Sequence, residues 1–160
     1  MQAWQQHVQS LSGLLDSLSF TARDGSPVGQ DAGFSLWVDM TLRLRERRNT
    51  VYMIGNGASA SMASHFAADL AKNGRVHTQV FSDLSLITAI SNDIGYDQVF
   101  AEPLRRRGQR GDVLVAISSS GRSPNILAAC DVADELAMSV VTLSSKDAAN
   151  PLRKRGDLDR

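Results

Sequence analysis

Short apolar runs alternate with longer segments of helical spacing from residue 51 onward. The apolar runs predict strands, and the segments with apolar residues every three to four positions predict helices. Residues 83–90 fit neither period and stay open between a short helix and a strand. Alternation of this kind predicts an α/β fold in which helices cover both faces of a parallel sheet. We expect strands at 51–54, 77–81, 112–117 and 139–143, and helices at 60–72, 97–107 and 124–136.

The first 48 residues show helical spacing alone. Apolar positions predict a helix over 1–20 and a second over 34–47, and the glycines and proline of 24–29 break the pattern between them. We predict that this segment lies outside the sheet. Its apolar surface exceeds what a small sheet edge needs, so we expect it partly to pack on the sheet and partly to form a subunit interface. Trp4 and Trp37 would be the large anchors of that interface.

A hydroxyl-rich loop follows the strand expected at 112–117. Its hydroxyls come from Ser118, Ser119, Ser120 and Ser123. Gly121 lets a ligand approach the backbone closely, and Pro124 fits the first turn of the next helix. A strand that feeds a helix leaves the first N–H groups of that helix unpaired, which favours a bound phosphate. An ordinary turn with Ser123 as helix cap is the alternative.

A second loop, Gly55-Asn56-Gly57-Ala58-Ser59, follows the apolar run 51–54 and leads into a helix. It lacks the Gly-Lys-Ser/Thr of a Walker loop and the third glycine of a dinucleotide-binding motif. The carboxyl ends of parallel strands meet at one edge of a sheet. Two such loops therefore predict a crevice for a small phosphorylated ligand at that edge.

Composition narrows the possible partners. Lys+Arg and Asp+Glu are both 17, so the formal net charge is zero and nothing indicates a nucleic acid or an acidic membrane as partner. No apolar run approaches the roughly 18 residues that span a bilayer. The single cysteine, Cys130, excludes an internal disulfide and suits a reducing compartment. At 160 residues the chain can bury the core of one domain, and we expect a soluble cytoplasmic protein.

Five segments resemble, in order, the sugar isomerase (SIS) domain family and within it the phosphoheptose (sedoheptulose 7-phosphate) isomerases. They are residues 55–59, 65–70, 91–100, 111–114 and 117–125. The resemblance implies a three-layer α/β/α sandwich with a five-stranded parallel sheet. It also implies a homo-oligomer, usually a tetramer, with sites at subunit interfaces. The chain would then divide into an N-terminal helical segment, 1–48, and an SIS domain, 49–160.

Residues 156–160 look like a turn entering a further strand. We therefore expect the last strand to be missing and the domain to be truncated at its C-terminus. The implied activity is aldose–ketose isomerisation of a phosphorylated sugar, a heptose used for surface polysaccharide. The alternative is a non-catalytic module that binds and senses a phosphosugar. A further alternative is a doubly wound domain that takes some other phosphorylated ligand.

The resemblance also implies roles for individual residues. Ser59, Ser118, Ser119, Ser120 and Ser123 match positions that hold the sugar phosphate. Asn56, Gly57, Ala58, Asn92 and Asp93 match positions that contact the sugar, although the family usually has glycine at position 58. An Asx turn is the alternative for Asn92 and Asp93.

His65 matches a zinc-binding histidine, and Asp69 stands where the family typically has a glutamate that binds zinc and acts as the base. Aspartate is one methylene shorter, which retracts the carboxylate by roughly 1–1.5 Å, and a misplacement of about 1 Å can cost on the order of a hundredfold in rate. The remaining zinc residues of the family, a Gln and a His, fall beyond residue 160. We expect His65 and Asp69 to face the pocket of Ser59 and Ser120, and to be too few to retain zinc.

Overall fold

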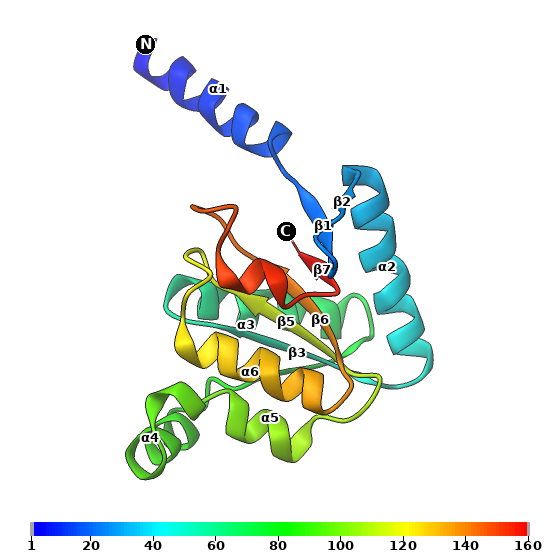
Figure 1. Ribbon diagram of the computed structural model, residues 1–160, viewed down its shortest axis with the longest axis vertical. Helices are drawn as coiled ribbons and strands as arrows, with labels where there is room; N and C mark the ends of the chain where they lie inside the picture. The colour runs from blue at the N-terminus through cyan, green and yellow to red at the C-terminus, as the bar shows by residue number, and fades with distance from the viewer. Residues whose placement is uncertain (1, 160) are drawn as a thin grey trace.

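The computed structural model describes residues 2–159, in which seven strands form one sheet between layers of helices (Figure 1). The order across the sheet is β2-β1-β7-β6-β5-β3-β4. The strands are β1 (Phe20–Ala22), β2 (Pro27–Val28), β3 (Thr50–Gly55), β4 (His77–Val80), β5 (Val113–Ile117), β6 (Ser139–Leu143) and β7 (Leu158–Asp159). The helices are α1 (Gln2–Asp16), α2 (Gln30–Glu46), α3 (Ala58–Lys72), α4 (Leu84–Asp93), α5 (Ala101–Arg107) and α6 (Pro124–Glu135), with 3₁₀ turns η1 (Tyr96–Gln98) and η2 (Pro151–Lys154).

The parallel part of the sheet runs β7-β6-β5-β3-β4, so the predicted five-stranded parallel sheet is confirmed. Every residue of β5 is buried, as expected for a central strand covered on both faces. Side chains from one face, such as Leu114, pack with α4, α5 and α6. Those from the other face, such as Val115, pack with α2 and α3. The three-layer α/β/α arrangement follows from these two cores.

The prediction that residues 1–48 lie outside the sheet is wrong. β1 and β2 form a hairpin, and β1 pairs antiparallel with β7. Phe20 anchors the hairpin because its side chain is almost fully buried and its ring packs edge-on against Phe34, with the centroids 5.0 Å apart. The break at 24–29 therefore covers the turn of this hairpin and its second strand, β2. A strand of three residues is too short to leave a periodic pattern.

The expectation that the last strand is missing is also wrong. Leu158 and Asp159 form β7, which pairs in parallel with Val141 and Thr142 of β6. Asp157 supports this pairing, because its carboxylate accepts a hydrogen bond from the Val140 N–H at 2.9 Å. The strand holds two residues, so its sequence carries no alternation to detect.

Two helical segments differ from the pattern-based boundaries. The open segment 83–90 is helical as part of α4, and the Asp83 carboxylate caps it by accepting from the Leu86 N–H at 2.9 Å. The helix expected at 97–107 is divided into η1 and α5.

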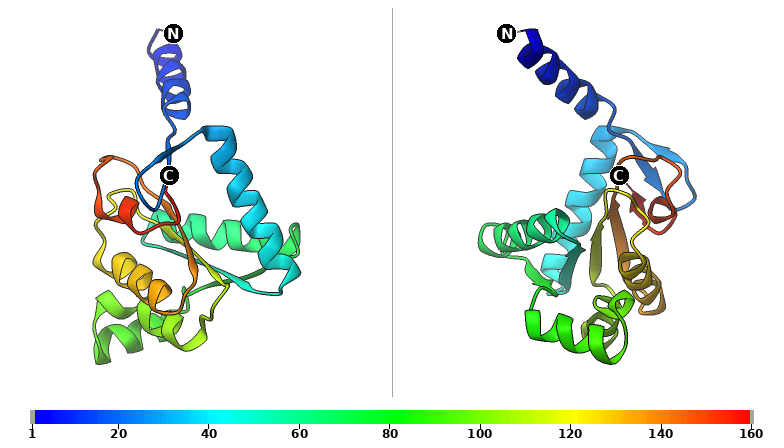
Figure 2. Two further views of the ribbon diagram at one scale, coloured as in Figure 1. Left: turned by 45° about the vertical axis from the view of Figure 1, so that its right-hand side comes forward. Right: turned by 90° about the vertical axis from the view of Figure 1, so that its left-hand side faces the viewer.

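Helix α1 projects from the body of the molecule (Figure 2). Trp4 on this helix is 72% exposed, whereas Trp37 on α2 is half-buried against the core. Among residues 2–159, no helix combines the length and apolarity needed to cross a membrane.

Candidate functional site

Two loops lie side by side at the carboxyl edge of the sheet. They follow β3 and β5, which are parallel neighbours, and the last residues of these strands, Gly55 and Ile117, are paired in register. Each loop leads directly into a helix, α3 after the first and α6 after the second. The structure thus brings the two predicted ligand-binding loops together at a single edge (Figure 1).

The loop Ser118–Ser123, called here the serine loop, is compact. The Gly121 N–H donates to the Ser118 carbonyl at 2.9 Å, and the Arg122 N–H donates to Ser120 Oγ at 3.3 Å. Gly121 has φ +62°, and a Cβ at this position would collide with the side chain of Asn150. This position therefore requires glycine for both its conformation and its close packing.

The hydroxyl of Ser123 makes no capping hydrogen bond to α6 within residues 2–159. Its Oγ lies 3.2 Å from the Oγ of Ser118 instead, and Ser118 is 5% exposed. The alternative of a turn capped by Ser123 is therefore not the arrangement of this loop. The two hydroxyls sit together before α6, where the helix dipole favours an anion.

A neighbouring segment, residues 144–150, supports the serine loop. The N–H and Oγ of Ser145 both donate to the Ser119 carbonyl at 3.2 Å, and the Arg122 guanidinium pairs with the Asp147 carboxylate at 2.7 Å. The Ala149 N–H and the Arg122 guanidinium hold the pKa of Asp147 below its usual value. Sequence reasoning missed this support, because no motif links segments that lie about 26 residues apart.

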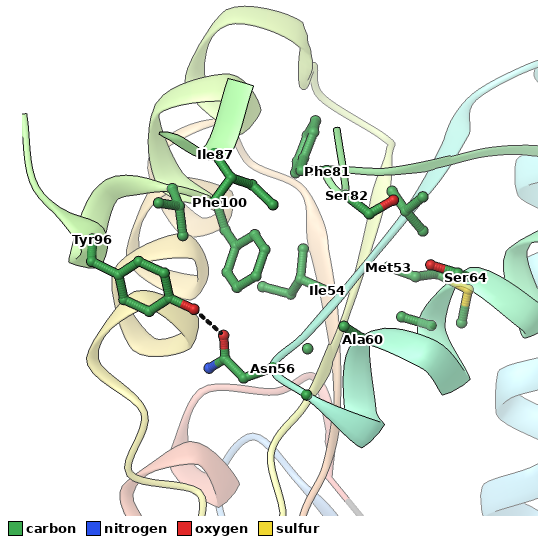
Figure 3. Close-up of a pocket in the computed structure, with 15 residues that line it drawn as sticks. Met53, Ile54, Asn56, Ala60, Ser64, Phe81, Ser82, Ile87, Tyr96 and Phe100 are labelled. Carbon is green, nitrogen blue, oxygen red and sulfur yellow. Dashed lines mark hydrogen bonds between the residues drawn. The ribbon is translucent and has the colours of Figure 1, made fainter. Parts of the chain in front are cut away.

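The first loop holds Asn56 by side-chain hydrogen bonds. Asn56 Nδ2 donates to Asn125 Oδ1, and Asn125 Nδ2 donates back to Asn56 Oδ1, each at 2.9 Å. The hydroxyl of Tyr96 also donates to Asn56 Oδ1, at 3.2 Å (Figure 3). Tyr96 and Asn125 fall within the family-like segments 91–100 and 117–125, but the sequence alone assigned them no role in the site.

A pocket of about 180 Å³ opens beside Asn56, between α3 and the segment from β4 to η1. Its polar lining includes Asn56, Ser64, Ser82 and Tyr96, and its apolar wall includes Phe81 and Phe100 (Figure 3). Gly57 also lines this pocket. Ala58 and Ser59 begin α3 directly after it.

Asn92 and Asp93 lie at the exposed C-terminal end of α4, where Asn92 Nδ2 donates to Asp93 Oδ1 at 2.8 Å. The pocket lining includes neither of them. The structure therefore brings Asn56 and Gly57 to the pocket but does not bring Asn92 and Asp93 into its lining.

His65 and Asp69 occupy successive turns of α3, with Nε2 and Oδ2 3.4 Å apart. The expectation that they face the pocket of Ser59 and Ser120 is wrong for this chain. Asp69 instead lines an apolar groove of about 620 Å³ between α2 and α3, and His65 is 75% exposed. At about 1.5 Å per residue, position 65 lies roughly 10 Å along the helix from Ala58, away from the edge where the loops meet.

The donors that would suit zinc are an imidazole and a carboxylate on one helix face. Within residues 2–159, no group of three or more His, Cys, Asp or Glu side chains is placed to hold a metal ion. His65 and Asp69 by themselves do not fit a zinc site.

A family model and individual known proteins both show similarity of this chain to one family. The model of the SIS domain family matches residues 32–145. The phosphoheptose isomerase of Helicobacter pylori is 38% identical over 116 residues, which are 69% of this chain and 60% of that protein. The chain thus spans about three fifths of the length of this curated relative.

Solved structures give the same result. The phosphoheptose isomerase from Neisseria gonorrhoeae is 36% identical with a TM-score of 0.70, over 75% of this chain and 65% of the other. The phosphoheptose isomerase from Francisella tularensis is 28% identical with a TM-score of 0.72, over 78% of this chain and 68% of the other.

Proposed function

The chain belongs to the SIS domain family, and on that basis we propose that it binds a phosphorylated sugar and interconverts its aldose and ketose forms. The observation that carries the proposal is the pairing of the serine loop with the Asn56 loop at one sheet edge. The identity of 36–38% to two phosphoheptose isomerases supports a seven-carbon sugar phosphate as substrate.

In this proposal the serine loop holds the phosphate. Its hydroxyls and the first N–H groups of α6 are donors that match phosphate oxygens. The left-handed turn at Gly121 and the support from residues 144–150 fix the loop before a ligand arrives. A preorganised anion subsite loses little conformational freedom on binding.

The isomerisation transfers a proton between neighbouring carbons through an enediol, which requires a base beside the sugar. We assign that role to Asp69, with His65 as its partner at 3.4 Å. Within one chain the pair lies on α3, away from the serine loop, so we propose that it acts on sugar in an assembly of several chains.

The exposed face of α1 supports self-association. Trp4, Leu14 and Leu15 on this helix are each about two-thirds exposed or more, and such apolar patches favour association. We propose that α1 joins copies of the chain into a homo-oligomer. Deleting residues 1–17 should then reduce the mass measured by light scattering, while the intact chain should exceed monomer mass at micromolar concentration. An intact chain of monomer mass would contradict this.

A second candidate is a non-catalytic module that binds and senses a phosphosugar. It is favoured by Asp69, which is shorter than the glutamate typical of the family, and by the absence of a third metal donor within residues 2–159. We also propose a cytoplasmic location. Cys130 is a free, buried thiol whose pKa burial raises to about 12, so it is inert and suits a reducing compartment.

The deciding experiment combines calorimetry with an isomerisation assay on sedoheptulose 7-phosphate, comparing the parent with Asp69→Glu and Asp69→Asn. For a working base, Asn abolishes turnover while Glu keeps or raises it. Binding without turnover in the parent and in the Glu variant would select the sensing module. Equal turnover in all three variants would remove Asp69 from the chemistry.

A further inference from the structure

We infer that Asn125 is a positioning residue that orients Asn56 toward the sugar and ties the sugar end of the site to its phosphate end. The inference rests on the proposed function and adds a residue to it. Asn125 lies in the first turn of α6, and Asn56 lies in the loop between β3 and α3. Their side chains join the two loops by hydrogen bonds, although they lie 69 residues apart in the sequence.

Asn125 is 2% exposed and both polar groups of its amide are used by Asn56. A buried amide in a reciprocal pair has a fixed orientation, because turning it would place like groups against each other. Because Asn125 is almost fully buried and Asn56 is more exposed, a ligand meets the amide of Asn56 first. Asn125 acts on a ligand through Asn56.

The hydrogen bonds of the Asn56 amide show which of its polar groups remains available to a ligand. Its Oδ1 accepts from Asn125 and from the Tyr96 hydroxyl, which fills both lone pairs. Its Nδ2 gives one hydrogen to Asn125. Within residues 2–159, one N–H of the Asn56 amide is left, so Asn56 serves as a hydrogen-bond donor. Because this amide is uncharged and lies in the loop after β3 rather than in the serine loop, we assign the donor to a carbonyl or hydroxyl oxygen of the sugar.

The pair also fixes the spacing between the two ends of the site. Asn125 follows Ser123 and Pro124, so the helix that carries the serine loop also carries the side chain that holds Asn56. Movement of the Asn56 loop away from the serine loop would break two hydrogen bonds between buried or half-buried groups. A sugar phosphate that spans both loops gains from this fixed spacing, whereas inorganic phosphate reaches the serine loop alone.

The test compares two probes on the intact chain: sedoheptulose 7-phosphate by calorimetry and inorganic phosphate by NMR titration. Asn125→Ala should weaken binding of the sugar phosphate about tenfold and change binding of inorganic phosphate less than about twofold. The double variant Asn56→Ala/Asn125→Ala should bind no more weakly than Asn56→Ala, because Asn125 acts through Asn56.

Tyr96→Phe provides a variant that is safe for folding, since Tyr96 is 56% exposed. This variant removes one donor to Asn56 Oδ1. It should weaken binding of the sugar phosphate about threefold and leave binding of inorganic phosphate unchanged. Tyr52→Phe is the matched control. The Tyr52 hydroxyl donates to the Arg107 carbonyl at 2.8 Å, outside both loops, so its loss should change neither affinity. Asn49→Ala, which removes another buried asparagine that pairs with Asp112, should lower stability without changing either affinity.

Equal weakening of both probes by Asn125→Ala would show a general scaffold role and overturn the inference. Unchanged affinities in Asn125→Ala and Tyr96→Phe, or additive losses in the double variant, would overturn it as well. These results leave the proposed function standing, because the parent still binds the sugar phosphate. If the parent binds neither probe, the proposed function falls and this inference falls with it.

Discussion

The serine loop and the His65–Asp69 pair differ in how much of the chain holds them in place. Ser118 is 5% exposed and its loop is tied to β6, to residues 144–150 and to the start of α6. The side chains of His65 and Asp69 are 75% and 53% exposed and contact each other at 3.4 Å. A single chain therefore preorganises the anion subsite by itself. The side chains of His65 and Asp69 need further contacts before they can hold a defined geometry.

The largest expected effect tests the preorganisation of the serine loop. Gly121→Ala should lower the free energy of unfolding by about 3 kcal/mol or more, because it adds a collision with Asn150 to a left-handed backbone. It should also remove phosphate binding. Urea unfolding and NMR titration with phosphate measure the two effects.

Gly57→Ala is the matched control for this glycine. Gly57 also has positive φ, +55°, but within residues 2–159 nothing lies within 4 Å of an added Cβ. We expect a smaller loss than for Gly121→Ala, from backbone conformation alone, because φ +55° with ψ −122° is a conformation that glycine adopts more readily than other residues. Equal losses in the two variants would mean that the close packing against Asn150 does not hold the loop.

The next effect tests the hydroxyls. The double variant Ser118→Ala/Ser120→Ala should weaken sugar-phosphate binding by about 1–3 kcal/mol, since hydrogen bonds to a charged group are lost. Calorimetry gives the affinity, and Ser85→Ala on the exposed start of α4 is the control. An unchanged affinity in the double variant would make the serine loop an ordinary turn.

The third prediction concerns zinc binding by the exposed pair, His65 and Asp69. The chain of residues 1–160 should carry far less than one zinc ion per chain after gel filtration, because two exposed donors do not close a site. Metal analysis by mass spectrometry measures this, with His65→Ala as the comparison. Stoichiometric zinc that disappears in His65→Ala would show that other donors join His65 in the assembled protein.

The smallest effect concerns stability. Asp69→Ala should change the free energy of unfolding by about 0.5 kcal/mol or less, because an exposed pair on successive helical turns is screened by water. Urea unfolding at moderate ionic strength is sensitive enough to detect a larger value. A loss of unfolding free energy several times greater would contradict this and would mean that the pair stabilises α3 despite the exposure of both side chains.

The central strands β3, β5 and β6 could be predicted from the sequence because they are largely apolar runs of five or six residues. Strands β1, β2 and β7 have two or three residues, and the pairing of β1 with β7 depends on contacts between residues far apart in the chain. The two loops could also be predicted, since each has its turn chemistry within a few consecutive residues. The Asn56–Asn125 pair could not, because no periodicity connects side chains 69 positions apart.

The placement of His65 and Asp69 shows a further limit of the sequence. Their spacing predicts that they share one face of a helix, and the structure agrees. Which neighbour that face meets depends on how α3 lies against α2, and this packing leaves Asp69 at an apolar groove. Helical spacing determines which residues are neighbours on a helix but leaves open what lies opposite them.

The antiparallel pairing of β1 with β7 has a consequence for synthesis of the protein. Thr21 is paired with Asp159, so this strand cannot find its partner until nearly all of the described chain has left the ribosome. The sheet from β3 to β6 can assemble earlier, while the β1–β2 hairpin has no strand of the main sheet to pair with. Contacts over such a separation close slowly. Joining of the two ends is therefore expected to be a late event in folding, whereas Phe20 can pack against Phe34 of α2 well before it.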